Sequence, residues 1–211
     1  MNEDRIKKIR EVASMRQGNL AVVIENVVDL HNLGAIMRSC DAVGVHEIFV
    51  LHSDKSIAKE TIKLGKRTSA GTRKWLDIHY YTEVEPCFLH VKNKYERVLA
   101  THLSEKSVSL YELDLTQSVA LLFGGEHAGI TAESLTFCDG NFLIPQVGMV
   151  PSLNVSVAAA VSLFEAYRQR NEKQFYSNNK TLSDIDKSHI LETYMARSEL
   201  KDRRNETHKI V

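Results

Sequence analysis

The chain alternates short, almost wholly apolar segments with segments of helical periodicity. "LAVVIE" at residues 20–25 and "EIFVL" at residues 47–51 are typical of strands that are buried on both faces. The segment between them, "NLGAIMRSCDAVGV", carries apolar residues at helical spacing: Leu33, Ile36, Met37 and Cys40. Buried strands joined by helices predict an α/β fold, in which helices cover both faces of a parallel sheet.

The same alternation extends over most of the chain. Further strands are expected at residues 76–81, 97–101, 119–123 and 141–145, helices at residues 57–65, 83–93 and 131–137, and a longer helix from about Leu153. We therefore expect three parts. They are a basic helix in residues 1–18, one α/β domain in residues 19–170, and a linker followed by a docking helix in residues 171–211.

Charge is distributed unevenly, although 27 Lys and Arg balance 27 Asp and Glu. Residues 1–18 carry five basic against three acidic side chains, and residues 167–211 carry ten against seven, so both ends are basic and the middle is acidic. Basic ends on one face would suit the phosphates of a nucleic acid. The alternative is that they are solvated helix faces.

Cysteine usage and hydropathy exclude several classes of protein. Cys40, Cys87 and Cys138 are odd in number and far apart, without the paired spacing of a zinc site, so we expect reduced thiols and no metal. No apolar stretch approaches the roughly 18 residues of a membrane span, and the charged first residues do not look like a signal peptide. We expect a soluble, cytoplasmic protein.

Three polar or glycine-rich segments follow predicted strands, where ligands bind in open parallel sheets. They are "NVVDLHNLGAIMR" at residues 26–38, "GGEHAG" at residues 124–129 and "PQVGMVPSLN" at residues 145–154. Taken alone, Asn32 is more typical of a helix cap, Arg38 of a surface charge and the Gly-Gly-Glu of a plain turn. Neither the dinucleotide fingerprint nor a P-loop is present, which disfavours a nucleotide-binding oxidoreductase or an NTPase.

In this order and spacing, "NLGAIMRSCDAVGV", "LLFGGEHAGI" and "IPQVGMVPSLNVSVAAAV" resemble the three motifs of the SpoU (TrmH) branch of the SPOUT RNA methyltransferases. The third motif is matched residue by residue. The resemblance covers about residues 20–170. It implies a parallel α/β sheet with a C-terminal deep trefoil knot, a homodimer, S-adenosylmethionine as cofactor, and methylation of an RNA ribose 2′-hydroxyl.

The resemblance also implies roles for individual residues. Its catalytic positions fall on five residues: Asn32, Arg38, Glu126, Ser152 and Asn154. Its cofactor-binding positions fall on another five: Thr101, Gly124, Gly125, Ile144 and Leu153. The family's proposed base matches Arg38, but a free guanidinium has a pKa above about 12 and stays protonated. We therefore expect Arg38 to hold an RNA phosphate and to stabilise the developing alkoxide, while the proton leaves to phosphate or water.

The short helical ends resemble those of the group that methylates guanosine 18 of transfer RNA. On that basis we expect four arginines to contact phosphates: Arg10, Arg16, Arg168 and Arg170. A methyltransferase acting on 23S ribosomal RNA is the alternative with the same chemistry. A non-catalytic RNA-binding member of the family is less favoured, because Asn32, Arg38 and Asn154 are all present.

Overall fold

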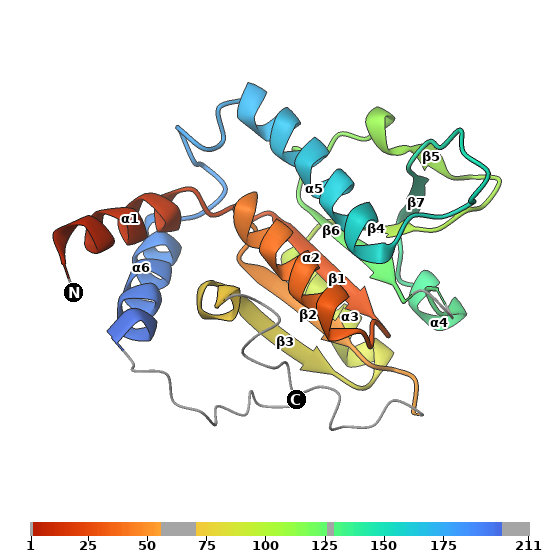
Figure 1. Cartoon of the computed structure of the whole chain (residues 1–211), viewed down its shortest axis with the longest axis horizontal. Helices are drawn as coiled ribbons and strands as arrows, with labels where there is room; N and C mark the ends of the chain where they lie inside the picture. Colours follow the sequence, from red (N-terminus) through yellow and green to blue (C-terminus); the bar gives the residue numbers. More distant parts are fainter. Residues whose placement is uncertain (1, 56–70, 126–128, 200–211) are drawn as a thin grey trace.

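The computed structural model describes residues 2–55, 71–125 and 129–199, which form a parallel sheet with helices on both faces (Figure 1). The described strands are β1 (Leu20–Glu25), β2 (Glu47–Leu51), β3 (Asp77–Tyr81), β4 (Arg97–Thr101), β5 (Val108–Ser109), β6 (Val119–Gly124) and β7 (Gly140–Leu143). They lie in the order β3-β2-β1-β6-β4-β7-β5, and every pairing is parallel. The predicted α/β class and its parallel sheet are confirmed.

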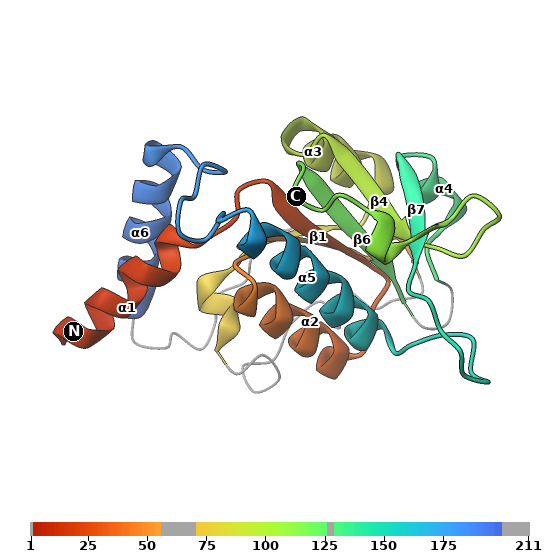
Figure 2. The same cartoon turned by 90° about the horizontal axis from the view of Figure 1, so that it is seen from above.

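The described helices are α1 (Glu3–Ser14), α2 (Leu30–Ala42), α3 (Val84–Lys94), α4 (Ala132–Leu135), α5 (Val155–Glu172) and α6 (Asp184–Glu199), with 3-10 turns η2 (Thr72–Trp75) and η3 (Leu110–Glu112). Figure 2 shows α2 and α5 on one face of the sheet and α3 on the other. Each face has its own apolar core, and every residue of β1 and β2 is buried. No helix in the described ranges is both long and apolar enough to cross a bilayer.

The strands at residues 20–25 and 47–51 have the bounds that the sequence predicts. The helix predicted at residues 57–65 lies outside the described residues. The short strand β5 was not predicted, because two residues at the sheet edge beside β7 leave no periodic pattern to detect.

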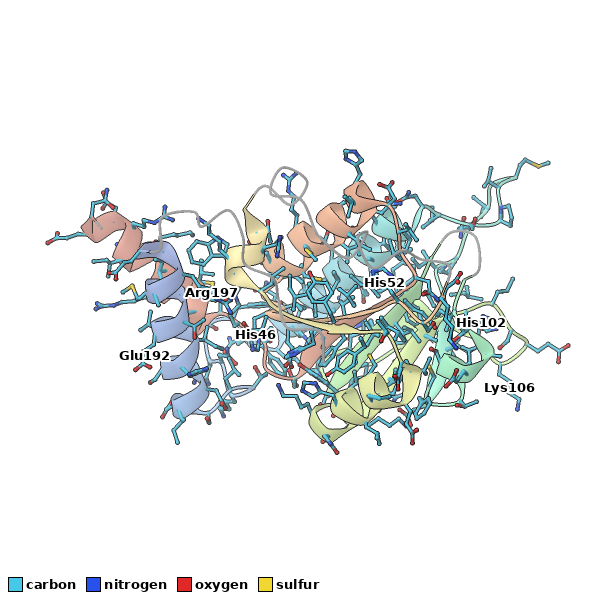
Figure 3. All side chains as sticks on the ribbon, turned by 90° about the horizontal axis from the view of Figure 1, so that it is seen from below. His46, His52, His102, Lys106, Glu192 and Arg197 are labelled. Carbon is cyan, nitrogen blue, oxygen red and sulfur yellow. The ribbon has the colours of Figure 1, made fainter. Side chains whose placement is uncertain are left out.

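The first and last described helices, α1 and α6, lie side by side and form a helical module (Figure 1). Ile9 and Ala13 of α1 pack against Ile190 and Tyr194 of α6. Arg197 of α6 donates to the Asp77 carboxylate over 2.7 Å. Figure 3 shows Arg197 at the end of the sheet where His46 precedes β2, while His52 and His102 follow their strands at the opposite end.

Arg16 and Arg170 require a correction, because both side chains are fully buried rather than presented to RNA. Arg16 pairs with the Asp41 carboxylate and donates to the Val45 carbonyl over 3.2 Å. Arg170 donates to the carbonyls of Leu115 and Gln117 and to Asn19. The Arg16 guanidinium therefore ties the segment after α1 to α2 and to the segment before β2, and the Arg170 guanidinium ties α5 to the segments before β1 and β6. Phosphate cannot reach either group in this structure.

Candidate active site

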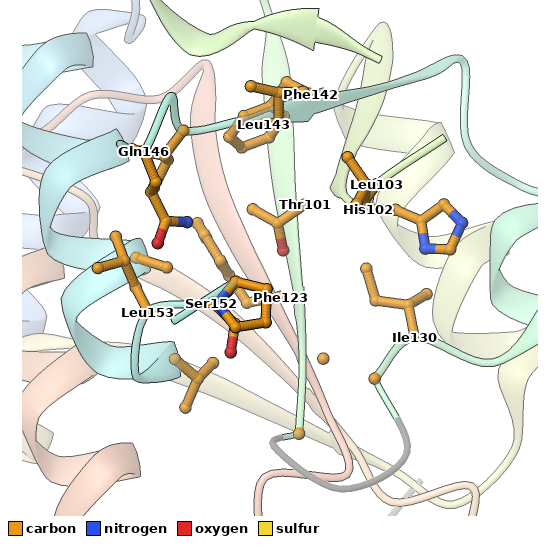
Figure 4. A pocket seen from close by; sticks show the side chains of 17 residues that line it. Thr101, His102, Leu103, Phe123, Ile130, Phe142, Leu143, Gln146, Ser152 and Leu153 are labelled. Carbon is orange, nitrogen blue, oxygen red and sulfur yellow. The ribbon is translucent and has the colours of Figure 1, made fainter. Parts of the chain in front are cut away.

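A cavity of about 490 Å³ lies at the carboxyl end of the sheet. It is lined by the segments that follow β4, β6 and β7 and by the start of α5 (Figure 4). Six residues that the sequence singled out line it: Thr101, Gly124, Gly125, Ile144, Ser152 and Leu153. The second and third motifs, separate in the sequence, therefore share one cavity.

The glycine turn after β6 fits its neighbours so closely that side chains are excluded. A Cβ on Gly125 would lie 2.3 Å from the carbonyl oxygen of Asn26, and one on Gly124 would lie 2.3 Å from the carbonyl carbon of Gly129. Contacts this short would force the backbone apart. Glycine therefore lets position 125 approach Asn26 after β1 and lets position 124 approach Gly129, and both glycines line the cavity.

Asn32 of the first motif and Asn154 of the third motif are brought into contact. The Asn154 amide donates to the Asn32 side-chain oxygen over 3.1 Å. The Asn154 oxygen caps α5, accepting from the Ser156 amide over 2.9 Å. Because Leu153 and Val155 on either side line the cavity, this asparagine pair marks its border.

The other catalytic candidates are placed less directly. Arg38 lies further along α2 with an exposed side chain, and it is not among the cavity-lining residues. In the described parts of the chain, no hydrogen bond or ion pair holds its guanidinium. Glu126 lies outside the described residues. The roles of Arg38 and Glu126 therefore stay predictions.

The two remaining arginines predicted to bind RNA are exposed. Arg10 lies on α1. Arg168 on α5 makes ion pairs of 2.8 Å with both Glu165 and Glu172. Its hydrogen bond with Glu165, followed by that with Glu172, raises the pKa of the guanidinium. Arg10 is thus the freer of the two for a phosphate contact.

Sequence reasoning missed several residues that line the cavity. His102 and Leu103 follow β4 directly, Gln146 follows β7, and Phe123 and Phe142 supply aromatic walls (Figure 4). The signal available in the sequence was their position, since His102 and Gln146 come just after strands. Aromatic residues inside strands gave no such signal, because they look like ordinary core residues.

One cluster of metal-ligating side chains, Glu47, His79 and His90, lies away from the cavity. The Glu47 carboxylate is already bound by the Lys94 ammonium over 2.5 Å and by the Tyr95 hydroxyl over 2.6 Å. A cation thus already neutralises the only carboxylate in the cluster, and this arrangement supports no metal role.

The comparisons with known proteins agree with this geometry. The model of the SpoU rRNA Methylase family matches residues 19–164. The tRNA (guanosine(18)-2′-O)-methyltransferase of Aquifex aeolicus is 37% identical over 96% of this chain and 93% of its own length. The 23S rRNA (guanosine-2′-O-)-methyltransferase RlmB of Xanthomonas axonopodis pv. citri is 35% identical over 80% of this chain and 65% of its own length.

Two solved structures extend the likeness to three dimensions. The A. aeolicus TrmH/SpoU tRNA modifying enzyme superposes with a TM-score of 0.82 at 37% identity, covering 94% of this chain and 98% of that one. The SpoU methyltransferase AviRb from Streptomyces viridochromogenes, solved in complex with AdoMet, is 28% identical with a TM-score of 0.63, covering 81% of this chain and 65% of that one. The fold, the shared cavity and the family match together show that this chain belongs to the SpoU methylase family.

Proposed function

We propose that this protein transfers the methyl group of S-adenosylmethionine to the ribose 2′-hydroxyl of guanosine 18 in transfer RNA. The observation that carries the proposal is the cavity in which the second and third motifs meet, bordered by the contact between Asn32 and Asn154. The tRNA substrate is supported by the Aquifex aeolicus relative, which matches 96% of this chain. The longer ribosomal relative matches over only 65% of its length.

The cavity suits the cofactor in size and in lining. Its volume of about 490 Å³ falls in the range typical of small-molecule sites. Phe123 and Phe142 offer apolar contacts for a base, and the turn at Gly124 and Gly125 offers backbone groups. We assign Thr101, Ile144 and Leu153 to backbone contacts with the cofactor, as the family resemblance suggests.

When bound, S-adenosylmethionine supplies an activated methyl group on a sulfonium. The protein's own contribution is to position the ribose and to stabilise the negative charge that develops on its oxygen. We assign the stabilisation of this charge to Arg38. Its exposed, planar guanidinium can also donate two parallel hydrogen bonds to one phosphate. Asn32, Ser152, Asn154 and Glu126 complete the proposed catalytic set.

We also propose the family's homodimer and deep trefoil knot for this chain. A dimer is supported by exposed apolar side chains on α5, where Phe164 is 52% and Val157 is 47% exposed. The knot is supported by the match to the SpoU methylase family. After β7 the chain returns across the sheet, where α5 packs beside α2 (Figure 2). A cytoplasmic location is part of the same proposal, because it follows from a tRNA substrate.

The test is to incubate the protein with isotope-labelled S-adenosylmethionine and unmodified tRNA, then to map the product by nuclease digestion and mass spectrometry. We expect one methylated ribose at guanosine 18, and none in a transcript with adenosine at that position. Methylation of 23S rRNA fragments without tRNA methylation would favour the ribosomal alternative. Transfer to no RNA would overturn the proposal.

A further inference from the structure

Glu25, the last residue of β1, has a fully buried carboxylate. In the described parts of the chain no cation pairs with it, so hydrogen bonds alone must compensate for its burial. Its Oε1 accepts from the hydroxyls of Ser53 over 3.1 Å, Thr131 over 2.7 Å and Ser134 over 2.8 Å. Its Oε2 accepts from the Thr131 backbone amide over 3.1 Å.

Glu25 also holds Gly125 through a backbone hydrogen bond. The Gly125 amide donates to the Glu25 carbonyl oxygen over 2.8 Å. Glu25 thus binds Gly125 with its main chain and Thr131 with its side chain. Gly124, Gly125, Gly129 and Ile130, between or beside these anchor points, all line the cavity.

Gly125 also packs tightly against the residue that follows Glu25. Gly125 already lies so close to Asn26, the neighbour of Glu25, that a Cβ would not fit. We propose that Glu25 is a positioning residue for the cofactor, which holds Gly125 and the segment at Gly129 and Ile130 in the arrangement that binds S-adenosylmethionine. This inference rests on the proposed function, because it assumes that the cavity takes that cofactor.

A purely structural role would give a different result. Thr131 caps α4, and its side chain accepts from the Ser134 amide over 3.2 Å. If Glu25 served only this cap and the core, its loss would lower stability and leave cofactor affinity in the folded protein unchanged.

Glu47 provides a matched control, because its carboxylate is also buried and richly bonded. It lies at the first residue of β2, so it sits at the opposite end of the sheet from the cavity. Burial alone would raise the pKa of Glu47, but its bonds from His79, Lys94 and Tyr95 hold that pKa well below its usual range. Glu47→Ala should therefore destabilise the fold without touching the cavity.

The experiment compares Glu25→Ala, Glu25→Gln and Glu47→Ala with the wild type. We would measure S-adenosylmethionine affinity by calorimetry, melting temperature by circular dichroism, and KM for cofactor and tRNA separately. Ala at position 25 leaves the Thr131 amide without its acceptor, so we expect cofactor affinity to fall about tenfold or more, with KM for tRNA unchanged. Glu25→Gln keeps an acceptor for that amide and donates to the hydroxyls, so it should retain most of the affinity.

Amide hydrogen exchange in the ligand-free protein gives a second readout. We expect faster exchange at Gly125 and Thr131 in Glu25→Ala, and wild-type exchange there in Glu47→Ala. Wild-type affinity in Glu25→Ala, or equal losses in Glu25→Ala and Glu47→Ala at matched stability, would overturn the positioning role. Equal cofactor affinity in Glu25→Gln and Glu25→Ala would also overturn it, since the negative charge of Glu25, rather than its hydrogen bonds, would then be responsible for cofactor binding. Failure of the wild type to bind the cofactor would instead overturn the proposed function.

Discussion

Arg38 and Arg170 carry the same guanidinium and meet opposite surroundings. Arg38 projects from α2 into solvent, and no described residue holds it. Arg170 is fully buried on α5, where the segments before β1 and before β6 supply acceptors for it. The difference shows what makes an arginine available to bind RNA. A guanidinium already bonded to acceptors of the protein is not available, even when it lies in a basic part of the sequence.

Burial also changes the pKa of Arg170. Desolvation lowers the pKa of Arg170 to about 10, so the group is still charged at neutral pH. A charged group in this position must keep its hydrogen bonds to remain buried. We therefore expect substitutions of buried arginines to change stability and substitutions of exposed ones to change catalysis or RNA binding.

The largest expected effect is on the fold, from Arg170→Met. Removing the guanidinium leaves the acceptors of Leu115, Gln117 and Asn19 without their donor, and at roughly 1–3 kcal/mol for each we expect the free energy of unfolding to fall by about 3 kcal/mol or more. Urea denaturation followed by circular dichroism measures it. The protein that remains folded should methylate tRNA at close to the normal rate. An unchanged unfolding midpoint with weakened tRNA binding would instead show that Arg170 contacts a phosphate.

Arg38→Lys tests the exposed arginine of this comparison. Lysine keeps the charge but cannot reproduce the planar fork, so we expect kcat to fall about a hundredfold or more. The melting temperature should not change, because Arg38 is exposed. Single-turnover kinetics with saturating tRNA separates this loss from weaker binding. Near-normal turnover would discard Arg38 as the group that stabilises the alkoxide.

A smaller effect should follow from Asn154→Ala, which removes both the cap of α5 and the contact with Asn32. We expect a loss of about 1 kcal/mol in stability together with lower activity. Asn154→Asp is the matched control, because aspartate still caps the helix but cannot donate to Asn32. Restored stability without restored activity would separate the two roles, and full activity in the aspartate variant would show that the donor is dispensable.

The smallest effect is expected from Arg10→Ala. A single exposed phosphate contact should raise KM for tRNA a few-fold and reduce the salt dependence of binding by about one counterion. Arg168→Ala is the comparison, and its effect should be weaker, because Glu165 and Glu172 already occupy that guanidinium. Filter binding across a series of salt concentrations measures both. Identical salt slopes for wild type and Arg10→Ala would remove Arg10 from the interface.

The sequence predicted the sheet better than it predicted the surface. Strands β1 and β2 are buried on both faces, so nearly all of their side chains must be apolar. Such a continuous apolar run can be recognised in the sequence alone. Strand order is different, because it depends on contacts between segments far apart. Nothing near Val119 indicates that β6 pairs with β1.

The candidate site was predicted through the family motifs rather than through local chemistry. Gly125 and Asn154 look like a turn and a helix cap in isolation, and their use depends on which segments the fold brings beside them. Glu25 was read simply as the end of a strand, since no local pattern shows a buried carboxylate bonded to Thr131. The burial of Arg16 was missed for the same reason, because its partner Asp41 lies on another element.

The pairing of α1 with α6 has a consequence for synthesis on the ribosome. Helix α1 is synthesised before the described strands, whereas α6, which covers Ile9 and Ala13, is synthesised after them. At 12 residues, α1 is too short to be stably helical by itself in water. We therefore expect the nascent chain to complete its sheet before α6 closes the helical module over α1.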